Sequence, residues 1–217
     1  MAIGKNAEAP IAGEDQREAE RIELALRPAK LVCQSGEYAC QMRDVSTLGV
    51  GLAFLHDVPP EPRMILQLAS GHTYPVERVW IGKRQAGFRF AADVSLVEFL
   101  DDDGAQDAAP LKLKLVAPAQ VIDGRNQIFA TISEMGCEEV RIKSAEPLAF
   151  NRLLAFEIDG LTRQLGEVRW KDGDHYGLQF QHPLALQELA RCALHHQPFG
   201  TSFPSGFAGL LSAARAA

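Results

Sequence analysis

The chain has 217 residues, of which 47% are hydrophobic and 23% are charged, and its formal net charge is −6. This length suits one large domain or two small ones, and the apolar content is sufficient for a core in each half. Because the balance is negative and no basic block occurs, we expect neither nucleic acid nor an anionic membrane surface as a partner.

The sequence shows no membrane span and no export signal. No run approaches the roughly 20 apolar residues that a span requires, and Met1 to Asp15 carries scattered charges without an apolar segment. We therefore expect a cytoplasmic protein. The four cysteines fit a reducing compartment, their spacing matches no zinc site, and Cys33 and Cys40 are interpreted as small buried hydrophobes.

After a disordered arm over residues 1–13, the first half of the chain predicts short strands joined by Ser-Gly and similar turns, and then a short helix over residues 93–100. The predicted strands are Ala29 to Cys33, Tyr38 to Arg43, Gly49 to Leu55, Met64 to Leu68, His72 to Trp80 and Ala86 to Phe90.

An acidic, proline-ended stretch over residues 104–110 has the composition of a linker. Beyond it the pattern of strands and turns resumes, and a longer helix is predicted over Pro183 to His195, before a tail over residues 201–217. The predicted strands are Lys112 to Ala117, Asn126 to Ile132, Glu139 to Ile142, Leu153 to Ile158, Leu165 to Trp170 and His175 to Gln181. Many short strands at regular spacing indicate small antiparallel barrels or sandwiches.

The two halves form an internal repeat. Trp80 and Trp170 lie 90 residues apart, and Gly87 and Gly177 keep that offset. Upstream, the segment from Asp44 to Gly49 aligns with Thr131 to Gly136 at an offset of 87. A nearly constant offset across unlike residue types indicates two domains of one kind. Since the tryptophans recur in both copies, we expect them in the core or at a barrel rim.

Two short motifs in the first copy carry the candidate chemistry. Arg17 and Arg21 stand four residues apart, and Asp44, Ser46 and Gly49 form an Asp-x-Ser-x-x-Gly turn. Guanidinium groups offer planar pairs of donors to phosphate or to a guanine edge, and a carboxylate can accept from guanine N–H groups. In the 87-residue alignment the second copy keeps Ser133 and Gly136 but has no such arginines or aspartate.

Taken together, these motifs resemble the ligand-binding motifs of PilZ domains, receptors for cyclic di-GMP. The resemblance covers residues 14–103, and residues 111–200 resemble a degenerate copy. It implies a mainly β fold of two six-stranded antiparallel barrels, each followed by a helix. It also implies that Arg17, Arg21, Asp44, Ser46 and Gly49 bind cyclic di-GMP, with the arginine segment folding over the ligand.

The sequence is compatible with two functions. The first is a cyclic di-GMP receptor, without further cofactor or metal, that couples ligand binding to an unidentified protein partner. The second is a PilZ-like adaptor that works without nucleotide, because Glu18 and Glu20 could neutralise the arginines. No catalytic motif occurs, so we do not expect an enzyme.

Overall fold

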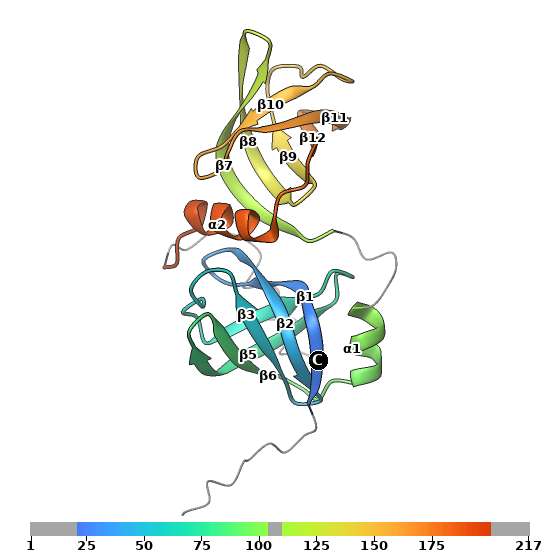
Figure 1. Cartoon of the computed structure of the whole chain (residues 1–217), viewed down its shortest axis with the longest axis vertical. Helices are drawn as coiled ribbons and strands as arrows, with labels where there is room; N and C mark the ends of the chain where they lie inside the picture. Colours follow the sequence, from blue (N-terminus) through green and yellow to red (C-terminus); the bar gives the residue numbers. More distant parts are fainter. Residues whose placement is uncertain (1–20, 104–109, 201–217) are drawn as a thin grey trace, which may run out of the picture.

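The computed structural model describes residues 21–103 and 110–200, and within them the chain forms two closed β-barrels followed by one helix each (Figure 1). The predicted fold class of two six-stranded antiparallel barrels is therefore confirmed. The predicted arm over residues 1–13, the linker residues 104–109, the tail over residues 201–217 and Arg17 lie outside the described residues.

The first barrel closes in the order β1-β2-β3-β6-β5-β4, and β4 pairs back onto β1. Its strands are β1 (Ile22–Val32), β2 (Glu37–Ser46), β3 (Gly49–Phe54), β4 (Arg63–Gln67), β5 (Thr73–Gly82) and β6 (Gln85–Phe90). Alternate residues of these strands point inward, so Leu31, Met42, Leu52, Leu66 and Phe88 form one core. Helix α1 (Leu96–Asp103) covers an end of this core with Phe99, whose ring lies 5.1 Å from that of Tyr74.

The second barrel repeats this order with β7 (Lys112–Asp123), β8 (Asn126–Gly136), β9 (Glu139–Lys143), β12 (His175–Phe180), β11 (Gln164–Asp172) and β10 (Leu154–Glu157). Its core is separate and is built in the same way from inward-facing residues such as Ile132 and Phe156. Cys33 and Cys40 are buried free thiols, which confirms their interpretation as small core residues, and Cys192 is buried as well.

Helix α2 (Leu186–His196) lies between the two barrels and contacts both (Figure 1). The residue that ends it, Gln197, is only 2% exposed. Its side-chain oxygen accepts from the N–H of Glu37 at 3.0 Å, and its side-chain nitrogen donates to the carbonyl of Lys114 at 2.8 Å. Its backbone carbonyl accepts from the hydroxyl of Tyr38 at 2.7 Å. One buried glutamine thus bonds to strands of both barrels.

A second set of polar contacts joins the same strands. The carboxylate of Glu37 accepts from Lys30 at 2.6 Å and from the backbone N–H of Lys114 at 2.9 Å, and the Lys30 ammonium also donates to the carbonyl of Lys112 at 2.9 Å. Gly36 leaves room for the Gln197 side chain against the first barrel, because a Cβ at position 36 would lie 1.8 Å from the side-chain oxygen of Gln197.

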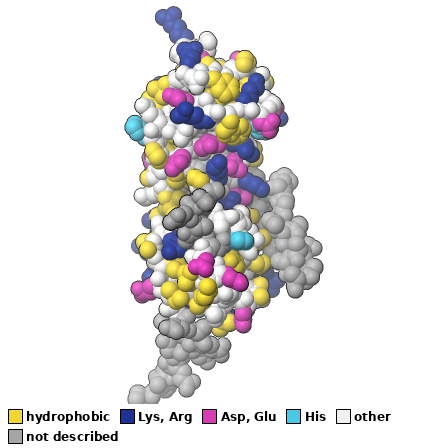
Figure 2. Space-filling view, turned by 90° about the vertical axis from the view of Figure 1, so that its right-hand side faces the viewer, with side chains coloured by type: hydrophobic (Ala, Val, Ile, Leu, Met, Phe, Trp, Pro, Cys, Tyr) yellow, Lys and Arg dark blue, Asp and Glu magenta, His cyan; other side chains and the backbone are white. Residues whose placement is uncertain are grey.

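On the face drawn in Figure 2, positive and negative side chains are interspersed over both barrels, with no field of a single sign. Neither α1 nor α2, the helices of the described chain, has the length and apolarity that a bilayer crossing demands.

Gln197→Ala should destabilise the contact between the barrels. It removes the partner of the buried Glu37 N–H, which costs roughly 1–3 kcal/mol when left unpaired, and that of the partly buried Lys114 carbonyl. We expect a lower midpoint in urea unfolding. Gln164→Ala is the matched control, since that amide bonds only to Thr162 at the surface; equal midpoints for the two variants would contradict the assignment.

His56 should make stability depend on pH below about 6.5. The ring is 4% exposed and packs near Tyr38 and Phe199, and burial lowers its pKa. Above the unfolded pKa of about 6.5 the ring is neutral in both states, so it does not change the free energy of unfolding. Below that pH the unfolded chain binds a proton that the folded chain does not. The free energy of unfolding then falls by at most about 1.4 kcal/mol per pH unit. Melting temperatures at pH 7.5 and 5.5 should differ more in the wild type than in His56→Asn. His182→Asn, at an exposed histidine, should behave like the wild type.

Candidate functional site

Two of the five predicted site residues meet at the start of β1. Arg21 stands directly before β1, and Asp44 lies near the end of β2, opposite Glu23. The Arg21 guanidinium donates to the Asp44 carboxylate at 2.5 Å, and both side chains remain partly exposed. The antiparallel pairing of the first two strands therefore brings together residues that are 23 positions apart.

Ser46 and Gly49 lie beside this pair but do not face solvent. Ser46 is 4% exposed, and its hydroxyl is 3.4 Å from the carbonyl of Gly49. A Cβ at Gly49 would lie 2.3 Å from the carbonyl oxygen of Phe88 in β6. Glycine is required there by the close approach of two strands. In this structure both residues shape the β2–β3 turn and its packing.

The outer surface beside Asp44 is built from four residues in register on four strands. Asp44 in β2 pairs with Gly51 in β3, Gly51 pairs with Gly87 in β6, and Gly87 pairs with Trp80 in β5. We call these residues the first row. A Cβ at Gly51 would lie 2.4 Å from the Asp44 carboxylate, and one at Gly87 would lie 2.0 Å from the indole nitrogen of Trp80. The two glycines thus leave room for the carboxylate and the indole to lie flat across the barrel wall.

A hollow of about 630 Å³ opens beside the first row. It is lined by Arg21, Glu23, Leu24, Leu26, Arg43, Asp44 and Trp80. Trp80 is 42% exposed, so it belongs to the surface of this hollow and not to the core. The sequence signal for this surface position is a glycine, Gly87, placed opposite Trp80 across the β5–β6 hairpin. An indole can lie flat only over a residue without a side chain.

Arg43 is a second residue that the motifs did not indicate. It has no partner in β3, because the pairing shifts between Met42 and Asp44, and this β-bulge turns two consecutive side chains outward. Its guanidinium donates to the side-chain oxygen of Gln85. The charged groups that line the hollow are Arg21, Arg43, Glu23 and Asp44, so their formal charges cancel.

Strand β1, which contributes Glu23, Leu24 and Leu26 to the lining of the hollow, is also irregular. The pairing of β1 with β2 shifts between Glu23 and Arg27. Within this bulge Leu26 is exposed and has a φ of 41°, a left-handed conformation that costs a residue with a side chain about 1–2 kcal/mol. Such strained positions persist where the surrounding structure holds them, and they concentrate at ligand sites.

The second barrel presents the counterpart of the first row, and it corrects the repeat alignment. Glu134, Arg141, Gly177 and Trp170 are paired in the same order, each 90 residues beyond its counterpart. The offset of 87 was wrong: Asp44 corresponds to Glu134, not to Thr131. Likewise Ser46 corresponds to Gly136, and Gly49 to Glu139, so the second copy does not keep the Ser and Gly of the turn. The resemblance between the two segments misled because short motifs carry no information on strand register.

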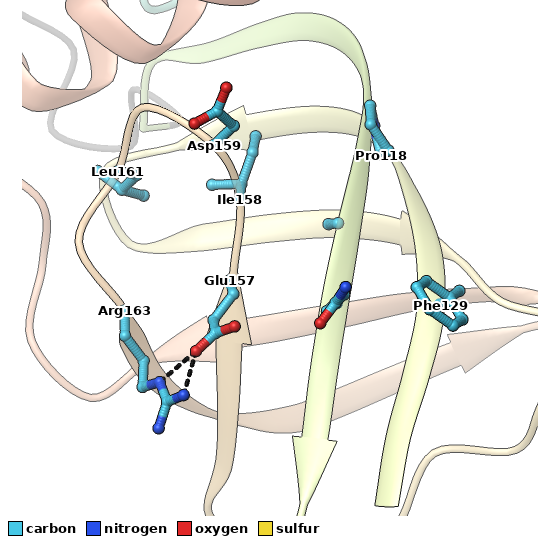
Figure 3. A pocket seen from close by; sticks show the side chains of 9 residues that line it. Pro118, Phe129, Glu157, Ile158, Asp159, Leu161 and Arg163 are labelled. Atoms are coloured by element: carbon cyan, nitrogen blue, oxygen red, sulfur yellow. Dashed lines mark hydrogen bonds and ion pairs between the residues drawn. The ribbon is translucent and has the colours of Figure 1, made fainter.

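A further hollow, of about 490 Å³, lies on the second barrel between β7–β8 and the loop after β10 (Figure 3). Phe129, Ile158 and Leu161 provide apolar walls. Its charged groups already have partners: Arg163 pairs with Glu157, and the His195 ring lies 2.8 Å from Asp159, a bond that lowers the pKa of that carboxyl. Because its charged groups are paired within the chain, this hollow is the weaker candidate.

The remaining residues considered from sequence have structural partners. His195 and His196 both bond to Asp159, which ties the end of α2 to the loop after β10. Across residues 21–103 and 110–200, no group of three or more His, Cys, Asp or Glu is arranged to hold a metal ion.

No family model and no curated protein matches the chain. Among solved structures the chain is similar to the following proteins. Borreliella burgdorferi PlzA in complex with c-di-GMP is 13% identical, with 79% of this chain and 92% of that chain covered and a TM-score of 0.34. The Bacillus subtilis inhibitor of motility MotI/DgrA is 10% identical, with 78% and 94% covered and a TM-score of 0.31. Escherichia coli YcgR in complex with c-di-GMP is 9% identical, with 88% and 87% covered and a TM-score of 0.29. At such TM-scores we base no conclusion about the site on them.

Gly87→Ala should displace Trp80 from the barrel wall. The added methyl group would lie 2.0 Å from the indole nitrogen, so the ring must swing toward water. In a Trp170→Phe background we expect the fluorescence emission of Trp80 to shift to longer wavelength. Gly82→Ala, in the same strand as Trp80, is the control, because a Cβ there would lie 3.3 Å from the flexible side chain of Gln85 and 3.6 Å from the Trp80 ring, an ordinary contact. Matching spectra for the two variants would count against the described position of the indole.

Proposed function

We propose that the chain is a receptor for cyclic di-GMP and that the hollow beside the first row is its binding site. The observation that carries the proposal is the combination of an exposed indole, a carboxylate and two guanidinium groups around a floor of two glycines. This set supplies a stacking surface, an acceptor for guanine N–H groups and donors for phosphate, which are the three contacts that a guanine dinucleotide requires.

The indole of Trp80 would provide the base contact. Stacking of a base on an aromatic side chain is worth about 1–3 kcal/mol. Asp44 lies at the other end of the first row, where its second oxygen remains available for the N1–H and N2–H donors of guanine. Arg21 keeps further donors beyond the one used for Asp44, because a guanidinium carries five N–H groups.

Charge makes the arm before β1 part of the proposal. The ligand carries two negative charges, whereas the charged groups that line the hollow cancel. Arg17, four residues before Arg21, would add the missing positive charge if its segment folds over the bound dinucleotide. Each charge-assisted hydrogen bond contributes roughly 1.5–3 kcal/mol, part of which offsets the ordering of the segment.

The proposed output is a protein contact and not a chemical reaction. Val79 precedes Trp80 in the bulge of β5 and is 64% exposed, and Leu26 lines the hollow and is 51% exposed. We expect these two side chains to form an apolar rim, which a protein partner that reads the bound state would contact together with the folded arm. The same rim supports the alternative of an adaptor that binds its partner without nucleotide, since the Arg21–Asp44 pair already satisfies both charges.

Calorimetric titration with cyclic di-GMP tests the proposal. We expect saturable binding at one site and a loss of about tenfold or more in affinity for Arg17→Ala, Arg21→Ala, Asp44→Ala and Trp80→Ala, since each removes a contact worth more than 1.4 kcal/mol. Cyclic di-AMP should bind more weakly, because adenine offers no N1–H or N2–H donor to Asp44.

Arg63→Ala is the matched control: this arginine lies on the same barrel, is exposed and pairs with Glu77 at 3.6 Å. It should bind like the wild type. Absence of binding heat in the wild type, or equal loss for Arg63→Ala and Arg21→Ala, would refute the receptor. A partner captured equally with and without nucleotide would favour the adaptor.

A further inference from the structure

The two barrels differ at one position of their rows in a way that decides whether the row is open. In the first barrel Gly51 separates Asp44 from Gly87, and the Asp44 carboxylate and the Trp80 indole lie over these two glycines without a side chain of the row between them. In the second barrel the same position, 90 residues later, is Arg141.

The Arg141 side chain lies where a base would stack in the first barrel. Its guanidinium carbon is 4.9 Å from the centre of the Trp170 ring. The position of the ring itself is unchanged, because a Cβ at Gly177 would lie 2.0 Å from the Trp170 indole nitrogen, as at Gly87 and Trp80. A guanidinium is planar and stacks on an indole as a nucleobase does. Accordingly Trp170 is less exposed than Trp80.

Neighbouring residues hold the second row in this closed arrangement. The indole nitrogen of Trp170 donates to Glu139 at 3.2 Å, and Lys112 pairs with the same carboxylate at 3.5 Å. Glu139 is the counterpart of Gly49. Lys112 pairs with Gly136, the counterpart of Ser46, and so lies at the position that Arg21 has in the first barrel. In this row the polar edge of the indole and the cation are both engaged with groups of the chain itself.

We infer that one position, occupied by Gly51 in the first barrel and by Arg141 in the second, determines which barrel admits a stacked base. Glycine leaves the first row open, and Arg141 occupies the second row as an internal substitute for the ligand. The inference rests on the proposed function for the identity of the ligand, whereas the occupation of the second row is a property of the chain alone. It predicts that exchanging the two side chains exchanges the accessibility of the two tryptophans.

Whether Gly51→Arg raises or lowers the affinity for cyclic di-GMP separates this inference from a purely electrostatic effect. Gly51→Arg adds a positive charge beside a site for a dianion, and charge alone would tighten binding. If the new guanidinium instead lies over Trp80 and its Cβ displaces Asp44, affinity for cyclic di-GMP falls by about tenfold or more, the loss expected for one stacked base. Thr73→Arg adds the same charge to an exposed position of the same barrel and is the control.

Acrylamide quenching in single-tryptophan backgrounds supplies the ligand-free test. Arg141→Ala with Trp80→Phe should increase quenching of Trp170, and Gly51→Arg with Trp170→Phe should decrease quenching of Trp80. Unchanged quenching of Trp170, or tighter binding by Gly51→Arg, would overturn the inference. If the wild type binds no cyclic di-GMP, the proposed function fails, and the two quenching results still decide whether Arg141 covers its row.

Discussion

The candidate site depends on the absence of two side chains from the wall of a closed barrel. Outward positions of a barrel normally carry side chains that cover the backbone, and at Gly51 and Gly87 they are missing on adjacent strands. The space is taken by the Asp44 carboxylate and the Trp80 indole, which lie across the glycines from opposite sides. A planar surface bounded by an acceptor and an aromatic ring follows directly from strand register.

Two bulges place these groups. On β2 the unpaired Arg43 precedes Asp44, and on β5 the unpaired Val79 precedes Trp80. Each bulge adds a residue to one strand, so two consecutive side chains face outward before the alternation resumes. The second barrel keeps both bulges, at Ser133 and Arg169. The scaffold of the site is therefore common to the two barrels, and their chemistry differs through the side chains mounted on it.

The sequence predicted the strands and their repeat well, because turns and period-2 alternation are local properties. Register was not predictable in the same way. Asp44 was aligned with Thr131 on the likeness of a six-residue motif, whereas the ladder pairs its counterpart, Glu134, with Arg141. Trp80 was expected in the core or at a rim since it recurs as Trp170, yet recurrence reports the shared scaffold and says nothing of exposure. The contacts of Gln197 with Glu37 and Lys114 join residues more than 80 positions apart, and no local pattern indicates them.

The distribution of buried polar groups indicates where this molecule can change most easily. At the contact between the barrels, Gln197, Glu37 and Tyr38 are all buried, and separating the barrels would exchange each of their mutual hydrogen bonds for one to water, at a net cost of roughly 0.5–1.5 kcal/mol per bond. At the hollow, Arg21 and Asp44 are partly exposed, so water can replace their contact at little cost. Both regions lie on the β1–β2 hairpin, one near each end. A ligand that engages Arg21 therefore meets little resistance at the open end of the hairpin, while the turn end remains fixed to the second barrel.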